Sequence, residues 1–137
     1  MIRPILLAYQ LLTGFSDTSA GALLLVAPAF TLRLMSLAAP ADALVYLSFI
    51  GSFVFAVGLS CFYGAWLLSR GPCRRPRLET VWLLTAFARA SVAVFVTQQV
   101  LIGNLDAGWL TVAAADGACV MIQAIGLRRG WLAHAAS

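Results

Sequence analysis

Four long apolar runs, separated by short polar breaks, constrain this chain more than any other feature. They extend over about residues 5–27, 43–69, 78–102 and 109–127. A transmembrane helix needs roughly 20 consecutive, predominantly apolar residues. Only 10% of the 137 residues are charged, against about 25% in soluble domains. These observations predict an all-α fold, a single transmembrane domain over residues 1–137 that forms a four-transmembrane-helix bundle.

The segment after the first run is too short to span a membrane. It reads "AFTLRLMSL" over residues 29–37, and it places Arg33 among apolar side chains. This pattern predicts a short amphipathic helix lying at the membrane interface. Asp42 and Asp106 precede the second and fourth runs, where each is predicted to act as a helix N-cap.

The first residues also admit a second interpretation. Residues 1–20 combine a basic start, a short apolar core and a Thr-x-Ala-like ending, which is typical of a cleaved secretory signal peptide. The apolar run continues directly after Ala20, which favours an uncleaved first span. Both interpretations stay open from the sequence.

Basic residues gather at matching ends of the runs. Arg3 precedes the first run, four arginines lie in the loop "RGPCRRPR" at 70–77, and Arg128 and Arg129 follow the fourth run. Cytoplasmic loops are enriched in Lys and Arg, so both termini are predicted to be cytoplasmic. Contact of the arginine loop with anionic lipid is a natural addition. Tryptophans near the ends of the runs predict an interfacial aromatic belt, formed by Trp66, Trp82, Trp109 and Trp131.

Three charged residues lie deep inside the apolar runs. Arg89 is near the middle of the third run, Asp17 is in the first and Asp116 is in the fourth. Counted from the predicted cytoplasmic ends at 1.5 Å per residue, Arg89 is roughly 16 Å deep, and the two aspartates reach nearly the same depth. A central arginine costs ~2.5–3.5 kcal/mol on insertion scales, so such residues face the bundle interior and pair. Arg89 is therefore predicted to pair with Asp116, Asp17 or both.

Further polar residues lie on the same predicted helical faces as these three charged residues. A spacing of four or seven residues keeps side chains on one helical face. The candidate intramembrane polar cluster accordingly comprises Asp17, Arg89, Asp116, Thr13, Gln10, Thr85 and Gln123. Two aspartates and one arginine leave one negative charge in excess, so one aspartate is expected to hold a proton or to be solvated in a water-filled cavity.

The second apolar run has no charge but carries a small residue at every fourth position. Small residues let another helix approach closely. The stripe is predicted to pack within the bundle, with packing against a second copy as the alternative, and it comprises Ser48, Ser52, Ala56, Ser60 and Gly64.

Several classes of function have little support in these residues. Cys61, Cys73 and Cys119 show no CxxC spacing and the single histidine is His134 in the tail, so no metal or cofactor is predicted. The net charge of +4 comes from arginines at the ends of the runs, so no nucleic-acid partner is predicted. No nucleophile–base pair or phosphate-binding loop stands out, which leaves the enzyme question open and disfavours catalysis.

Four stretches of the chain resemble a known group of proteins. They are "GALLLVAPAFTLRLM", "FIGSFVFAVGL", "TAFAR" and "AAADGA", and they are similar to small bacterial four-helix integral membrane proteins of the DoxX-like kind. The resemblance extends over most of the chain, including Arg89 and Asp116, but offers no counterpart for Asp17. It implies a four-helix bundle in a bacterial inner membrane and, for most such proteins, no established activity.

Two hypotheses of function follow. In the first, the protein is a structural or accessory membrane protein whose Asp–Arg–Asp cluster fixes the helix bundle, alone, as a homo-oligomer or with a membrane-complex partner. In the second, the cluster binds or carries a small lipophilic molecule or a proton, since intramembrane ionisable residues often mark functional sites. The lipid bilayer is the expected environment in both.

Overall fold

The computed structural model describes residues 2–70 and 75–136, and every regular element in those ranges is helical. The predicted all-α fold is therefore confirmed for the described chain. The four long helices are α1 (Ile2–Val26), α3 (Leu44–Ser69), α4 (Arg75–Leu101) and α5 (Leu110–Arg128). The short elements are α2 (Pro28–Leu34), α6 (Trp131–Ala136) and the 3₁₀ turns η1 (Ala41–Ala43) and η3 (Ala107–Trp109). Cys73 and Arg74 of the predicted arginine loop lie outside the described residues.

Three helical stretches are long and apolar enough to cross a membrane: Ala41–Ser69, Arg75–Leu101 and Ala107–Arg128. Large apolar side chains cover much of the outside, as Leu12 at 72% exposure and Leu101 at 81% illustrate. Soluble monomers rarely expose large contiguous apolar patches. The helices and this surface together indicate a membrane protein.

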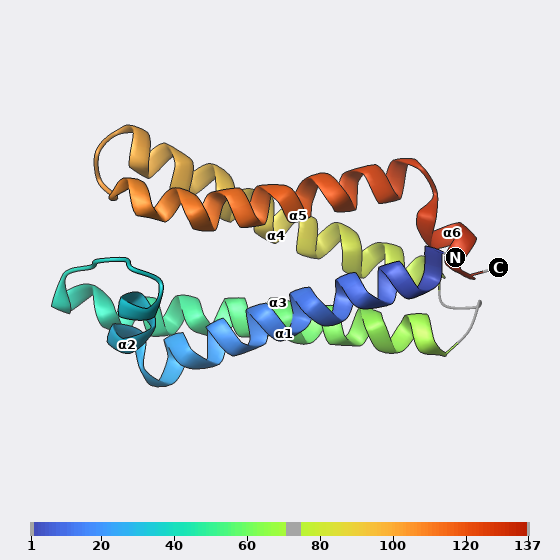
Figure 1. Ribbon diagram of the computed structural model, residues 1–137, viewed down its shortest axis with the longest axis horizontal. Helices are drawn as coiled ribbons and strands as arrows, with labels where there is room; N and C mark the ends of the chain where they lie inside the picture. Colours follow the sequence, from blue (N-terminus) through green and yellow to red (C-terminus); the bar gives the residue numbers. More distant parts are fainter. Residues whose placement is uncertain (1, 71–74, 137) are drawn as a thin grey trace.

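The long helices pair as two antiparallel hairpins, α1 with α3 and α4 with α5 (Figure 1). The start of α1, the end of α3, the start of α4 and helix α6 lie at one end of the bundle, which we call the terminal end. Helix α2 and the connection between α4 and α5 lie at the opposite end, the α2 end. The terminal end consequently collects most of the arginines of the described chain: Arg3, Arg70, Arg75, Arg77, Arg128 and Arg129.

Glycines hold α1 and α3 in backbone contact. A Cβ atom added at Gly21 would lie 2.7 Å from Phe55 Cα, and one at Gly51 would lie 2.7 Å from Leu24 Cβ. A Cβ atom at Gly58 would also collide with α1. Gly51 and Gly58 are seven residues apart, so they occupy one face of α3. These glycines form the seam of the first hairpin, because only small residues allow helices to approach so closely.

The small-residue stripe predicted on the second apolar run is not this seam. Ser52 and Ala56 are exposed, and of the stripe only Gly64 is buried. At 3.6 residues per turn, each four-residue step rotates by about 40° around the helix. The stripe therefore winds away from α1, whereas the seven-residue spacing of the glycines stays on one face.

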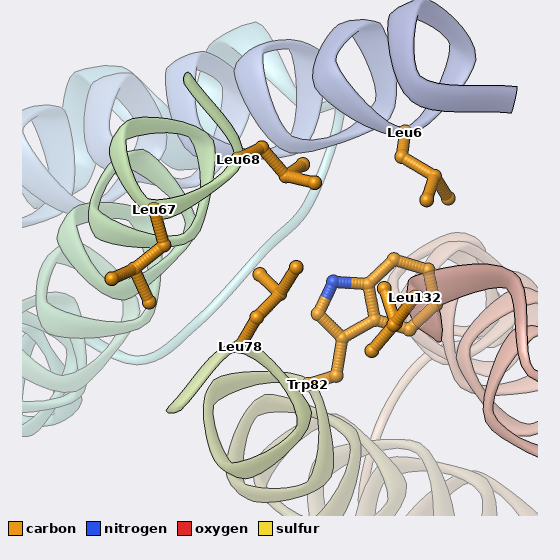
Figure 2. Close-up of a cluster of buried hydrophobic side chains, with 6 residues drawn as sticks. All are labelled: Leu6, Leu67, Leu68, Leu78, Trp82 and Leu132. Atoms are coloured by element: carbon orange, nitrogen blue, oxygen red, sulfur yellow. The ribbon is translucent and has the colours of Figure 1, made fainter. Parts of the chain in front are cut away.

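Two clusters of buried apolar side chains close the two ends of the bundle. At the terminal end, the terminal plug draws side chains from α1, α3, α4 and α6 and comprises Leu6, Leu67, Leu68, Leu78, Trp82 and Leu132 (Figure 2). At the α2 end, the α2 plug comprises Leu32, Leu37 and Leu47, packed against the partly buried Trp109 and Val112. Apolar packing thus lies on either side of the middle of the bundle.

Trp82 belongs to the terminal plug and not to an interfacial aromatic belt, so this part of the sequence prediction was wrong. Its side chain is fully buried, with 0% exposure. Gly126 on α5 makes room for it, since a Cβ atom added there would lie 2.7 Å from Trp82 Cζ3. The sequence position of Trp82 indicates that it lies near the end of an apolar run, but it does not show that its side chain is on the helical face that points into the bundle.

The predicted N-caps also differ from the structure. Asp42 lies inside η1, and neither η1 nor α3 has a side-chain cap hydrogen bond. Because η1 precedes α3 directly, the chain is already helical at the expected capping position. Asp106 does occupy the N-cap position of η3, but its side chain makes no cap hydrogen bond.

Candidate functional site

Arg89 links the two hairpins near the middle of α4. Its Nη1 donates to Asp116 Oδ1 on α5 at 2.7 Å, and its Nη2 donates to Asp17 Oδ2 on α1. The predicted pairing of Arg89 is confirmed, and it involves both aspartates. Arg89 is only 6% exposed, whereas the side chains of Asp17 and Asp116 retain 16% and 17% exposure. We call these three side chains the Arg89 bridge.

The energetics of the Arg89 bridge follow from its burial. Moving charges out of water is costly, and their mutual attraction offsets that cost only when the geometry is good. Here the guanidinium uses two separate nitrogens for two carboxylates on different helices. Charge-assisted hydrogen bonds of this kind are about twice as strong as neutral ones. The bridge therefore favours the one arrangement of the hairpins in which all three side chains meet.

A second layer of side chains lies two helical turns closer to the terminal end. Its members are each seven residues from a residue of the Arg89 bridge on the same helix, and they are Gln10, Trp82 and Gln123. Gln10 and Gln123 are each 1% exposed. A seven-residue step returns to nearly the same helical face and advances by about 10 Å. The faces that meet at the bridge therefore meet again in this layer.

Hydrogen bonds tie Gln123 to α4 in this region. Gln123 Nε2 donates to Thr85 Oγ1 at 2.7 Å, and Thr85 Oγ1 donates to the Val81 carbonyl at 2.8 Å. The predicted neighbours Thr85 and Gln123 thus contact each other across the second hairpin. Gln10 instead packs against Gly64 of α3, where an added Cβ would lie 2.6 Å from Gln10 Nε2.

Within the described residues, Thr13 makes no hydrogen bond to the Arg89 bridge. Its Oγ1 donates to the Tyr9 carbonyl at 2.8 Å, within its own helix. Cys61 of α3, which is buried, is a close neighbour of Thr13 and lies near Arg89. Of the predicted cluster, three residues form the bridge, two form a separate pair, and Gln10 and Thr13 line the same interior.

Sequence reasoning missed two residues that join separate helices. Tyr9 O–H donates to the Cys119 carbonyl at 3.5 Å, and its ring lies 5.5 Å from that of Trp82. Tyr9 is a partly buried aromatic residue with a polar end, on a helical face near Asp17, and this combination is the signal that could have identified it. Arg3 donates through Nε and Nη2 to the Leu68 carbonyl at 3.1 and 2.7 Å, and no local sequence signal predicted this contact.

The Arg89 bridge joins three helices through two ion pairs. The described residues contain no group of three or more His, Cys, Asp or Glu side chains that could hold a metal ion. Two shallow pockets, of about 250 and 400 Å³, lie at the α2 segment and between the ends of α4 and α5. Neither pocket is lined by a residue of the Arg89 bridge.

Comparison with protein-family models, with curated proteins and with solved structures found no match. The resemblance of the sequence to DoxX-like proteins therefore stays a prediction.

Proposed function

We propose that this chain is a small integral membrane protein with a structural or accessory role, in which the Arg89 bridge fixes how the two hairpins sit together. The observation that carries the proposal is the contact of one buried guanidinium with carboxylates from α1 and α5. Each of these charges would be costly inside a membrane without its partners. A bridge of this kind favours one packing of the two hairpins, and the bundle then presents a defined outer surface to a partner.

The proposal includes α1 as a fourth span. At 25 residues it is about 37 Å long, which exceeds the hydrocarbon thickness of roughly 30 Å. Polar residues interrupt its middle, but Asp17 meets the guanidinium of a helix that is apolar enough to span. Its antiparallel packing against α3 supports the same depth. Helix α2, which exposes Phe30, Arg33 and Leu34, would lie at the interface.

The proposed orientation places the terminal end in the cytoplasm. The positive-inside rule supports this, because basic residues collect at that end. Both termini would then be cytoplasmic, in a bacterial inner membrane as the DoxX-like resemblance implies. The same arginines would contact anionic lipid.

Native mass spectrometry of the protein released from lipid nanodiscs tests the role. A structural or accessory role predicts the bare chain, a second copy or a protein partner, with the same result for an Asp17→Asn variant that keeps the Asp116 pair. A stoichiometric small molecule that is present in the wild type and lost in Asp17→Asn would contradict it. The exposed Arg33→Met variant serves as the control.

The second candidate is a binder or carrier of a small lipophilic molecule or proton at the same residues. The specific observation in its favour is that the two carboxylates keep 16% and 17% exposure beside a nearly inaccessible guanidinium. A ligand reaching the site from the side would meet the carboxylates first. The small-molecule signal described above is the outcome that supports this candidate.

A further inference from the structure

Among the described residues, six buried side-chain nitrogen and oxygen atoms have no hydrogen-bond partner. Two of them, Thr18 Oγ1 and Trp109 Nε1, lie elsewhere, and four belong to the Arg89 bridge and the second layer: Gln10 Nε2, Trp82 Nε1, Arg89 Nε and Gln123 Oε1. Their side chains are 1%, 0%, 6% and 1% exposed, respectively. A buried polar group without a partner carries a large desolvation penalty, and no solvent is present inside a bilayer to relieve it. Native structures rarely leave several such groups together.

These atoms belong to side chains that surround one axis. Gln10, Trp82 and Gln123 each lie two turns from a member of the Arg89 bridge, on faces that already meet at the bridge. Contacts between helices confirm that the faces stay together in this layer, since Tyr9 packs on Trp82 at 5.5 Å and Gln123 bonds to Thr85 at 2.7 Å. The four unpartnered atoms thus belong to side chains in two successive layers of the same interior faces.

We propose that ordered water molecules bind in this interior, between the Arg89 bridge and the layer of Gln10 and Gln123. The unpartnered set contains three N–H donors and one carbonyl acceptor. Water accepts and donates at once, and buried waters typically make about three hydrogen bonds to otherwise unsatisfied polar groups. Neither pocket described above is lined by these residues.

The plugs cover both ends of this interior, so the proposed water site is not part of a channel along the bundle. Leu6 and Leu132 of the terminal plug are 2% and 1% exposed, and Leu32 of the α2 plug is 4% exposed. Water held between them also helps to solvate the negative charge that Asp17, Arg89 and Asp116 leave in excess. The inference rests on the proposed membrane bundle, but it assigns a ligand that the structural role alone does not require.

Gln10→Met is the sharpest test, because methionine keeps the length of the side chain and removes the amide. If a bound water accepts a hydrogen bond from Gln10 Nε2, the variant removes that hydrogen bond and leaves the water without this partner. The melting temperature in detergent–lipid micelles should then be lower than that of the wild type. If Gln10 Nε2 is truly without a partner, removing it relieves the desolvation penalty, and an unchanged or higher melting temperature overturns the proposal. Gln98→Met, at an exposed glutamine of α4, is the matched control and should have no effect.

Radiolytic hydroxyl-radical labelling gives a second measurement that does not depend on stability. Radicals formed from bound water modify adjacent side chains, so Trp82 should be labelled although it is fully buried, and the labelling should fall several-fold in Gln10→Met. The exposed Trp66 is the positive control. If Trp82 stays unlabelled while Trp66 reacts, the water site is refuted. Such a result leaves the Arg89 bridge, and with it the proposed structural role, intact.

Discussion

Replacing Arg89 with methionine should destabilise the protein more than any other single change to its polar interior. The substitution keeps an unbranched side chain but removes both contacts of the guanidinium, with Asp17 and with Asp116. Removing one partner of a buried ion pair typically costs about 3–5 kcal/mol, because the other charge is left without compensation. Here two carboxylates lose their partner, so we expect a loss near the upper end of that range.

A triple variant separates two effects of Arg89→Met: the loss of the ion-pair attraction and the cost of leaving two buried carboxylates without a partner. Asp17→Asn and Asp116→Asn, added to Arg89→Met, remove all three charges at nearly unchanged volume. Replacing a whole buried ion-pair group by uncharged residues is often neutral or even stabilising. The triple variant should therefore recover most of the stability lost in Arg89→Met, which a purely steric role for Arg89 would not produce.

Reversible unfolding in mixed micelles with increasing SDS measures these free energies. Arg33→Met is the matched control, because Arg33 is exposed on α2 and surface substitutions usually stay within about 0.5 kcal/mol. The reasoning is refuted if Arg89→Met unfolds like Arg33→Met. It is also refuted if the triple variant is as unstable as the single one.

Two further predictions concern the packing of the hairpins and the topology. Gly21→Ala should cost about 1–3 kcal/mol of stability in thermal unfolding, as overpacking does, because the new Cβ would lie 2.8 Å from Gly51 O. The control is Gly117→Ala, whose Cβ would meet nothing within 4 Å, and it should be neutral or stabilising. Equal effects of the two substitutions would contradict the glycine seam. In a cysteine-free background, an impermeant maleimide should label the exposed Ala107→Cys in intact cells and His134→Cys only after permeabilisation, and the reverse pattern would overturn the proposed orientation.

The Arg89 bridge was predictable because the position of a residue along a membrane-spanning apolar run gives its depth in the membrane. Asp17, Arg89 and Asp116 each lie about halfway along an apolar run, and the cost of an unpaired charge in hydrocarbon leaves few ways to place them. The sequence could not say whether one aspartate or both would pair. That choice depends on how far the two hairpins rotate about each other, which is set by packing of many side chains.

Features that depend on rotation about a helix axis were predicted less well. Trp82 lies near the end of an apolar run, but a position along the chain does not distinguish a buried face from an interfacial one. The stripe from Ser48 to Gly64 follows a four-residue spacing that drifts around α3, while the true seam uses the seven-residue spacing of Gly51 and Gly58. The contact of Arg3 with the end of α3 joins residues far apart in sequence, and no local pattern encodes it.

Solid-state NMR of the protein in lipid bilayers tests the central claim most directly. The measurement is a rotational-echo distance between the guanidinium nitrogens of Arg89 and the carboxyl carbons of aspartate. The account predicts contact with two carboxyl groups, consistent with the 2.7 Å separation of Arg89 Nη1 and Asp116 Oδ1, and with one after Asp17→Asn. Absence of any guanidinium–carboxyl contact in the wild type would contradict it.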